Sequence, residues 1–413
     1  MPGHIPPKIY PRKIASQIEK ALKIPEIIVI HGARQTGKTT LLDILMEKLR
    51  QKHESKNIVY FDLEDFELLE LCDKGVPSTI EHLKAIGCDF QKKIFLFIDE
   101  IQYLQNPSSF LKYFFDHWKG KIKLVVSGSS SFAIKSKFKD SLVGRTMDFE
   151  LFGLDFEEFL SFKELSFDLA TKDELVVNKL KKLFQEFIFY GSYPRIILEK
   201  SLEIKEALLK QIINTYLRKD IKDLANITDI NKFNKLLRVL AGQSGKLLNV
   251  LELANTVGIA RPTLDNYLAI LESTYVIKII NPFFRNLRAE LTKMPKVYFE
   301  DLGIKTILEK GGFARKLEGD NLETAVFSLL RKKFNAEGIH FWRTAQKEEI
   351  DFVVENRNHI LVYEVKINCR NKDRLLLNKF KKLYPKAKTH LVGFGFVDKQ
   401  KIKELNFIYP WQL

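Results

Sequence analysis

The sequence predicts an α/β protein built on a P-loop nucleotide-binding core of the additional-strand type, with smaller domains after it. Two observations predict this core. The apolar run at 27–30 leads into a glycine-rich loop, and a helical pattern follows the loop. A second apolar run, at 94–98, ends in the adjacent carboxylates Asp99 and Glu100. Five predicted strands separated by helices, with the acidic strand far along the chain from the loop, favour the additional-strand arrangement.

The loop after the first strand fits the pattern G-x-x-x-x-G-K-[ST] at every position. Glycines allow backbone N–H groups to wrap around the α- and β-phosphates of a nucleotide, and the helix N-terminus adds partial positive charge. We expect Lys38 to reach the β- and γ-phosphates and the Thr39 hydroxyl to bind Mg²⁺. The residues predicted to bind ATP are Gly32, Ala33, Arg34, Gln35, Thr36, Gly37, Lys38, Thr39 and Thr40.

The second apolar run places two carboxylates where open α/β sheets bind their ligands, at the C-terminal end of a buried strand. We expect Asp99 to hold Mg²⁺ through water. We expect Glu100 to orient and deprotonate the attacking water. The roles of Lys38, Thr39, Asp99 and Glu100 together predict hydrolysis of ATP.

Three further residues of this half are candidates for contact with the γ-phosphate. Ser127 and Ser129 follow a predicted strand at 121–126 and either one could sense that phosphate, although a plain loop explains them equally well. Arg145 precedes the strand-like run 146–151 and is a candidate arginine finger. An ordinary surface arginine is the alternative.

The middle of the chain predicts two helical parts. Apolar spacing at 179–188 and 203–216 predicts helices of a lid. Residues 246–271 predict a helix, a turn at Gly258 and a second helix, and the strand-like run 275–280 extends this to a winged helix. In a DNA-binding protein the first residues of the second helix contact bases, and here they are Arg261, Thr263 and Asn266. A packing module between domains is the alternative, because this helix carries a single basic residue.

The C-terminal part predicts a smaller α/β domain with carboxylates on neighbouring elements. Asp351 and Glu364 fall on predicted strands, Glu323 falls on a predicted helix, and Lys366 shares the face of Glu364. This set resembles the PD-(D/E)xK nuclease fold, with Ile350 in place of the usual proline. The resemblance implies a second divalent metal held by the three carboxylates, with Lys366 activating water or neutralising the phosphorane. Buried carboxylates paired with Lys366 are the structural alternative.

The segments GARQTGKTTLL, FLFIDEIQYL, VVSGSS and SLVGR together resemble a known family. It consists of prokaryotic ATPases of the AAA superfamily with a restriction-endonuclease-like C-terminal domain of unassigned function. The resemblance covers nearly the whole chain and implies that Pro194 lies against the adenine, although two residues rather than one separate it from Gly191. From the patterns along the chain we expect an AAA-like core at 1–155, a helical lid at 156–225, a winged helix at 226–285 and a nuclease-like domain at 286–413.

Composition limits the class of protein and its partners. The chain of 413 residues is 45% hydrophobic and 29% charged, and it contains no apolar run long enough to span a membrane. The Pro-rich start lacks a signal-peptide pattern, and three scattered cysteines form no metal or disulfide spacing, so we expect a cytoplasmic protein without a membrane partner. The net charge of +15 favours a polyanionic partner such as DNA, although a lysine-rich proteome or a thermophile surface also explains it.

The function expected from these observations is Mg²⁺-dependent ATP hydrolysis coupled to conformational change, acting on DNA. One alternative is an ATP-gated, metal-dependent nuclease that uses Asp351, Glu364 and Lys366. Another is a nucleotide-controlled switch or scaffold that binds a protein partner or a second copy of the chain.

Overall fold

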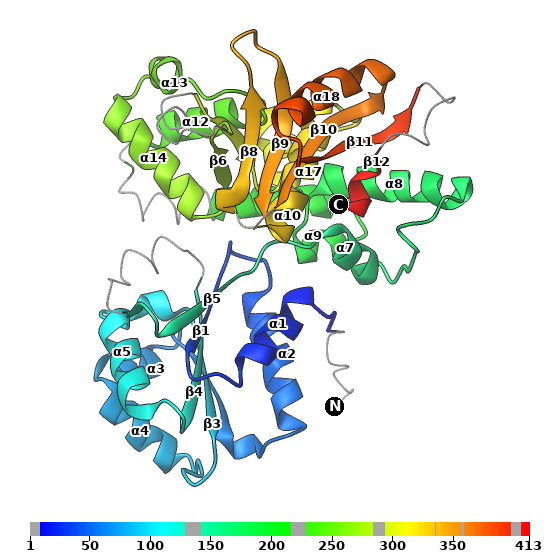
Figure 1. The fold of residues 1–413 in the computed structure, drawn as a ribbon. Helices are drawn as coiled ribbons and strands as arrows, with labels where there is room; N and C mark the ends of the chain where they lie inside the picture. The colour runs from blue at the N-terminus through cyan, green and yellow to red at the C-terminus, as the bar shows by residue number, and fades with distance from the viewer. Residues whose placement is uncertain are drawn as a thin grey trace. The chain divides into compact units, whose positions relative to one another are not determined.

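A computed structural model of the chain describes residues 9–128, 142–215, 227, 229–283, 294–334, 336–356, 359–397 and 406–413. The chain divides into two compact units, Met1–Phe152 and Gly153–Leu413, which are described separately below (Figure 1). The segments 156–225, 226–285 and 286–413, predicted as separate parts, all belong to the second unit. Ser129 lies outside the described residues.

The first unit is organised around a parallel five-stranded sheet of order β2-β3-β4-β1-β5. Because β4 lies between the loop strand β1 and the acidic strand β3, the sheet has the additional-strand arrangement. Every residue of β1, β3 and β4 is buried, as expected for central strands covered on both faces. The strands are β1 (Ile27–His31), β2 (Ile58–Asp62), β3 (Ile94–Asp99), β4 (Ile122–Gly128) and β5 (Thr146–Glu150).

Helices cover both faces of this sheet, and each face has its own hydrophobic core. Side chains alternate along β3, so that Leu96 and Ile98 enter one core while Phe95 and Phe97 enter the other. One core contains residues of α3 (Phe66–Asp73), α4 (Val76–Ala85) and α5 (Pro107–Trp118), and the other contains residues of α1 (Lys13–Ala21) and α2 (Lys38–Arg50). The result is a three-layer α/β sandwich whose central strands all end at one edge.

The second unit begins with helices. A helix–turn–helix is present: α13 ends at Gly258, which has a φ of +80°, and α14 follows. The strands β6 and β7 pair antiparallel after it. The winged-helix assignment itself stays a prediction. The elements are α7 (Phe156–Phe162), α8 (Glu174–Tyr190), α9 (Pro194–Leu198), α10 (Leu202–Ile212), α12 (Ile230–Gly242), α13 (Val250–Val257), α14 (Arg261–Ser273), β6 (Ile277–Ile280), β7 (Lys296–Phe299) and α16 (Leu302–Lys310).

A mixed sheet of order β12-β11-β10-β9-β8 completes the second unit. Strand β10 runs antiparallel to β9 and parallel to β11. Helix α17 packs against β10, and α18 packs against β9 and β11. The elements are α17 (Gly319–Lys333), β8 (Ile339–Arg343), β9 (Glu349–Asn356), β10 (His359–Cys369), α18 (Arg374–Leu383), β11 (Lys388–Phe396) and β12 (Phe407–Ile408).

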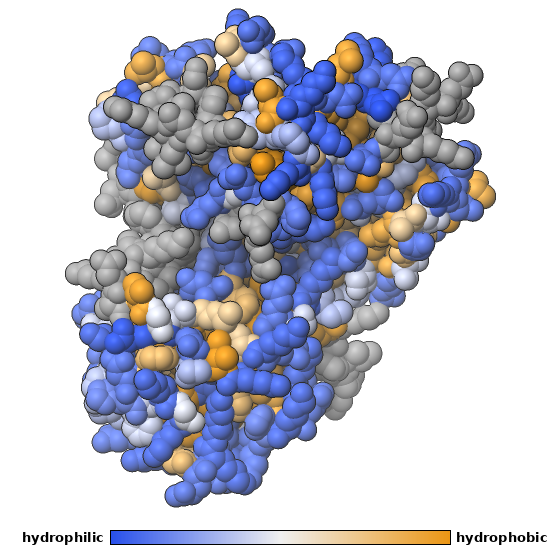
Figure 2. All heavy atoms as spheres, viewed as in Figure 1, coloured by the Kyte–Doolittle hydropathy of each residue, from blue (hydrophilic) through white to orange (hydrophobic). Residues whose placement is uncertain are grey.

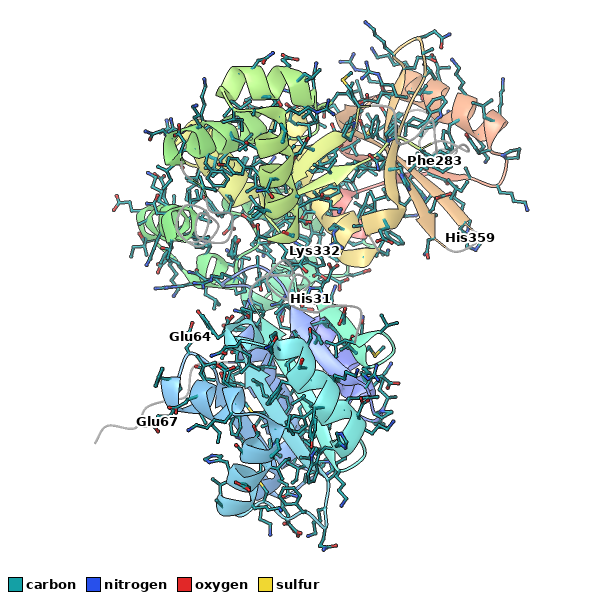
Figure 3. The ribbon with its side chains drawn as sticks, turned by 90° about the vertical axis from the view of Figure 1, so that its left-hand side faces the viewer. His31, Glu64, Glu67, Phe283, Lys332 and His359 are labelled. Carbon is teal, nitrogen blue, oxygen red and sulfur yellow. The ribbon has the colours of Figure 1, made fainter. Side chains whose placement is uncertain are left out.

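The C-terminal residues tie this sheet to the first helices of the unit. The ring of Trp411 lies 5.8 Å from that of Phe184 on α8 and 6.1 Å from that of Phe394 on β11. Lys332, labelled in Figure 3, donates a hydrogen bond to the carbonyl oxygen of Leu154 over 2.8 Å. These contacts explain why the predicted lid and the predicted nuclease-like part form one compact unit. No helix among the described residues has the length and apolar character to cross a membrane.

Candidate nucleotide-binding site

Both glycines of the loop are required by its geometry. At Gly32 an added Cβ would lie 2.1 Å from the carbonyl oxygen of Leu151, so no side chain fits there. Gly37 has a φ of +93° and immediately precedes α2, a conformation that residues with a Cβ rarely adopt. The loop therefore runs from the end of β1 at His31 (Figure 3) to the first turn of α2 along a path that its sequence motif specifies.

Lys38 is held inside the loop. Its Nζ donates hydrogen bonds to the carbonyl oxygens of Gly32, over 3.1 Å, and Ala33, over 3.0 Å. Burial lowers the pKa of Lys38 to about 8, while the carboxylates of Glu100 and Asp99 act in the opposite direction. A buried ammonium group with carbonyl partners at the start of a helix is a strong donor for an anion that reaches the loop.

Asp99 is the point where the loop helix and three strands meet. Its Oδ2 accepts hydrogen bonds from the Thr39 hydroxyl at 2.7 Å and from the Tyr60 hydroxyl at 3.2 Å. Its Oδ1 accepts from the Ser127 hydroxyl. Asp99 is 2% exposed, so these partners replace the water that a free carboxylate would bind.

The pair Thr39 and Asp99 fits Mg²⁺. A hydroxyl and a carboxylate are the hard oxygen ligands that this ion prefers, and the remaining positions in nucleotide sites are filled by phosphate oxygens and water. Tyr60 is a neighbour of this pair that the sequence motifs do not mark. Burial, together with the charge of Asp99, raises the pKa of Tyr60, so its hydroxyl stays a donor to Asp99.

Glu100 has a left-handed backbone, with a φ of +53°. Non-glycine residues in this region carry strain and are enriched at functional sites. The backbone N–H of Glu100 donates to Asp99 Oδ1 at 3.0 Å, and the Gln102 amide donates to the carboxylate of Glu100. The backbone turn and Gln102 thus hold the second carboxylate at the edge of the sheet where β3 ends.

Arg12 holds the backbone of the phosphate loop through hydrogen bonds, and no motif in the sequence marks this residue. Its guanidinium donates to the carbonyl oxygen of Thr36 at 2.7 Å and to that of Phe152 at 2.8 Å. Arg12 is 7% exposed. The Thr36 hydroxyl in turn donates to the carbonyl oxygen of Ala33 at 2.8 Å. One planar group therefore joins the segment before α1, the phosphate loop and the last residue of the first unit.

The structure does not bring Arg145 to the phosphate loop of its own chain. Its carbonyl oxygen accepts a hydrogen bond from the N–H of Ile27 at 2.9 Å, at the start of β1. The loop begins at the other end of that strand, about 15 Å away at the usual rise of an extended chain. The side chain of Arg145 pairs with Asp116, with 3.0 Å between Nε and Oδ1. A role for Arg145 at the loop of a second copy stays a prediction.

The predicted adenine-contact turn has a structural role within the second unit. Gly191 has a φ of +82°, and an added Cβ would lie 2.5 Å from Asp301 Oδ1. Ser192 donates to Asp301 Oδ2 from its backbone N–H, at 2.7 Å, and from its hydroxyl, at 2.9 Å. Pro194 occupies the first position of α9, where a missing N–H costs nothing. The contact of Pro194 with adenine stays a prediction.

The carboxylates expected to form a second metal site are instead paired with lysines. Lys296 Nζ lies 3.1 Å from Glu323 Oε1 and 2.6 Å from Glu349 Oε1, and the Tyr298 hydroxyl donates to Glu323 at 2.6 Å. On β10, Lys366 Nζ lies 2.6 Å from Glu364 Oε1.

The remaining carboxylate, Asp351, is engaged as well. Its Oδ2 accepts from the backbone N–H of Val365 at 2.8 Å and lies 3.5 Å from Lys366 Nζ. Burial, with the charge of Asp351, raises the pKa of Glu323 to about 7 and that of Glu364 to about 8. No group of three or more histidine, cysteine or acidic side chains in the described part of the chain is placed to hold a metal ion. The predicted second metal at Glu323, Asp351 and Glu364 is therefore not supported, because two lysines neutralise these carboxylates.

The residues predicted to contact bases lie on α14. Arg261 and Asn266 are exposed and Thr263 is partly buried. The Nε of Arg261 lies 3.7 Å from Asp265 Oδ2 on the next turn, so a carboxylate offsets the single cation of this helix. Base contact by α14 stays a prediction.

Comparison with known proteins agrees with the site in the first unit. Residues 25–160 match a family model described as an AAA domain. Residues 181–313 and 318–413 match two models described as domains of unknown function, DUF8612 and DUF4143. With the loop geometry above, the first match shows that residues 25–160 are similar to an AAA domain and carry a P-loop.

Similar full-length proteins and solved structures were also found. An uncharacterized protein of Methanocaldococcus jannaschii is 27% identical over 91% of this chain and 81% of that protein. One of Haemophilus influenzae is 26% identical over 85% of this chain and 86% of its own length. The Aeropyrum pernix ORC1 protein in complex with DNA is 13% identical over 75% of this chain and 94% of that one, with a TM-score of 0.32. AMPPCP-bound DnaA from Aquifex aeolicus is 17% identical over 63% of this chain and 86% of that one, with a TM-score of 0.30.

Proposed function

We propose that the AAA-type domain binds ATP with Mg²⁺ and hydrolyses it, and that the nucleotide state changes the conformation of the chain. One observation carries this proposal: Thr39 at the start of α2 and Asp99 at the end of β3 meet over 2.7 Å. The two sequence motifs, far apart along the chain, thereby supply a hydroxyl and a carboxylate at one point. The buried ammonium group of Lys38 belongs to the same loop.

Each residue has a role that its surroundings support. Lys38 would exchange its carbonyl partners for oxygens of the β- and γ-phosphates. Thr39 and Asp99 would hold Mg²⁺, Asp99 through water, and the ion when bound would offset the phosphate charge. Ser127 keeps Asp99 oriented through its hydrogen bond to Oδ1. Gly32 and Gly37 shape the path along which backbone N–H groups wrap the phosphates.

Glu100 is proposed as the group that orients the attacking water and removes its proton. Its left-handed backbone points the residue out of the strand direction, and Gln102 restrains its carboxylate. Water must lie within hydrogen-bond reach of such a base for proton transfer. Arg12 and Tyr60 position the loop and Asp99 without touching phosphate in this scheme.

Titration of purified full-length protein with Mg²⁺-ATP tests the binding part of the proposal. Lys38→Ala should lose measurable affinity for ATP, because the loop then lacks its buried cation. Lys48→Ala is the matched control: Lys48 lies on the same helix but is exposed and paired with Glu19. Undiminished affinity in Lys38→Ala, with a control that behaves like the natural protein, would sink the proposal.

Two alternatives differ in what the same preparation would do. A switch or scaffold would hydrolyse ATP slowly and ignore added DNA. A metal-dependent nuclease would cleave DNA and lose that cleavage in Asp351→Ala. The pairing of Lys296 with Glu323 argues against the nuclease, because a metal at Glu323 would have to displace this lysine.

A further inference from the structure

One segment of the second unit carries a net charge equal to nearly half of the net charge of the chain. Residues 370–388 contain eight cations and a single carboxylate, that of Asp373. Their net charge is therefore +7, and the net charge of the whole chain is +15. Seven of these cations are exposed and Arg374 is partly buried. We call this set the α18 surface, because α18 forms its centre; it consists of Arg370, Lys372, Arg374, Lys379, Lys381, Lys382, Lys386 and Lys388.

Most cations of the α18 surface lack a counter-charge among the described residues. Lys379 forms an ion pair with Glu348. Within the described residues the other seven have no carboxylate at ion-pair distance. The carboxylate of Asp373 accepts a hydrogen bond from the backbone N–H of Arg370, over 2.7 Å. Figure 2 shows strongly hydrophilic side chains gathered over α18 on the viewed face. The positive charges on such a surface repel one another, and binding of a polyanion reduces this repulsion.

The other face of α18 argues against a membrane as that polyanion. Leu377 and Phe380 are buried in the core of the sheet, where the Phe380 ring lies 5.3 Å from that of Trp342. A helix that binds a lipid surface needs a free apolar face to enter the headgroup region. Of the other apolar residues of α18, Leu375 and Leu383 are exposed, but they lie at opposite ends of the helix and form no continuous apolar face.

The placement of aromatic residues favours a duplex over a single strand. Proteins that bind single strands stack bases on exposed aromatic rings. Here Phe380 is buried, and Tyr384 is partly buried and stacks on Phe380, with 4.5 Å between ring centroids. What the α18 surface offers is therefore lysine and arginine for phosphates, without a platform for bases.

We propose that the α18 surface binds the phosphate backbone of duplex DNA without reading its sequence. This inference goes beyond ATP hydrolysis and does not depend on it. It assigns DNA contact to α18 rather than to α14, where one exposed arginine is offset by Asp265. Counterion release then makes the affinity depend on salt, with a slope of about 0.9 per phosphate neutralised.

The test measures binding of the full-length protein to a short duplex of mixed sequence by fluorescence anisotropy, across a series of salt concentrations and without nucleotide. The test variant is Lys381→Gln with Lys382→Gln, both exposed on α18. The control is Lys179→Gln with Lys182→Gln, two exposed lysines on α8 of the same unit. Both variants remove two charges, so a general effect of net charge would weaken them equally.

The proposal predicts that the α18 variant binds several-fold more weakly and that its salt slope falls by about 0.9 for each lost contact. The α8 variant should match the natural protein, and duplexes of different sequence should bind alike. Equal loss in both variants, an unchanged α18 variant, or no duplex binding at low salt would each overturn the proposal. Because the assay contains no ATP, inactivity of the ATPase site would leave these outcomes unaffected.

Discussion

Arg12 connects the phosphate loop to the exit of the chain from the first unit. Its guanidinium donates to the carbonyl oxygens of Thr36 and Phe152, which lie far apart along the chain. A guanidinium can serve both carbonyls at once because its donors form a rigid fork, whereas an ammonium group is a single point. Residue 152 is the last residue of the first unit.

Replacement of Arg12 should weaken nucleotide binding without removing a group that touches phosphate. Arg12→Ala leaves one buried and one partly buried carbonyl group without this donor, and charge-assisted hydrogen bonds of this kind are worth about 1.5–3 kcal/mol each. We expect the KM for ATP to rise about tenfold or more, which corresponds to about 1.4 kcal/mol. Steady-state kinetics measure this change. Arg12→Lys should restore little, and an unchanged KM in both variants would remove Arg12 from this role.

At the residue scale, the sequence predicts the loop and the acidic pair because each lies within one short motif. Lys38, Thr39 and Asp99 lie together as the motifs imply. Arg12, Tyr60 and Lys296 could not be predicted, since each acts on a residue brought near only by the fold. Lys296 in particular forms an ion pair with Glu323, and this carboxylate belongs to no group of metal-binding side chains among the described residues.

At the scale of elements, the turn between α8 and α9 is defined by a buried carboxylate. Asp301 caps α16 by accepting from the backbone N–H of Ile304 at 2.9 Å, and its other oxygen accepts from Ser192. Gly191 is the residue that allows this close approach. The element that the sequence marks by a glycine and a proline is thus a link between α9 and α16 inside the second unit.

Gly191→Ala should destabilise the second unit more than the same change at Gly311. Both glycines have positive φ, and at Gly311, which is left-handed helical, a side chain costs about 1–2 kcal/mol. Gly191, with a ψ of −165°, lies in a region that is essentially restricted to glycine, so its backbone cost is higher. Only at Gly191 does the new Cβ also meet Asp301, whereas at Gly311 nothing lies within 4 Å of it. Thermal unfolding monitored by circular dichroism compares the two variants. Equal midpoints would show that Asp301 moves aside without cost.

The apolar pattern of the sequence predicts where single strands lie along the chain, but it does not predict their order in the sheet. Apolar runs locate β1, β3 and β4 closely, because central strands are buried on both faces. The position of β4 between β1 and β3 follows from pairing, which no single run encodes. The same holds for the second sheet, where β10 pairs antiparallel on one side and parallel on the other.

At the scale of the whole molecule, the chain divides into two compact units, and the division of the second unit into lid, winged helix and nuclease-like parts stays a prediction. Sequence boundaries at 225 and 285 mark changes of composition, but the packing of Trp411 between α8 and β11 crosses them. Contacts between residues so far apart along the chain have no local signal. The net charge is also unevenly distributed, since residues 370–388 carry +7 of the net +15.

The central claim is that the AAA-type domain hydrolyses ATP with Glu100 as its base, and one comparison tests it most directly. Steady-state Mg²⁺-ATP turnover and ATP affinity are measured for Glu100→Gln beside Glu64→Gln, an exposed carboxylate just after β2 (Figure 3). The account predicts that Glu100→Gln keeps its affinity and loses turnover by about 10²–10⁴-fold, the usual contribution of a positioned base. Glu64→Gln should keep both. Near-normal turnover in Glu100→Gln would contradict the account.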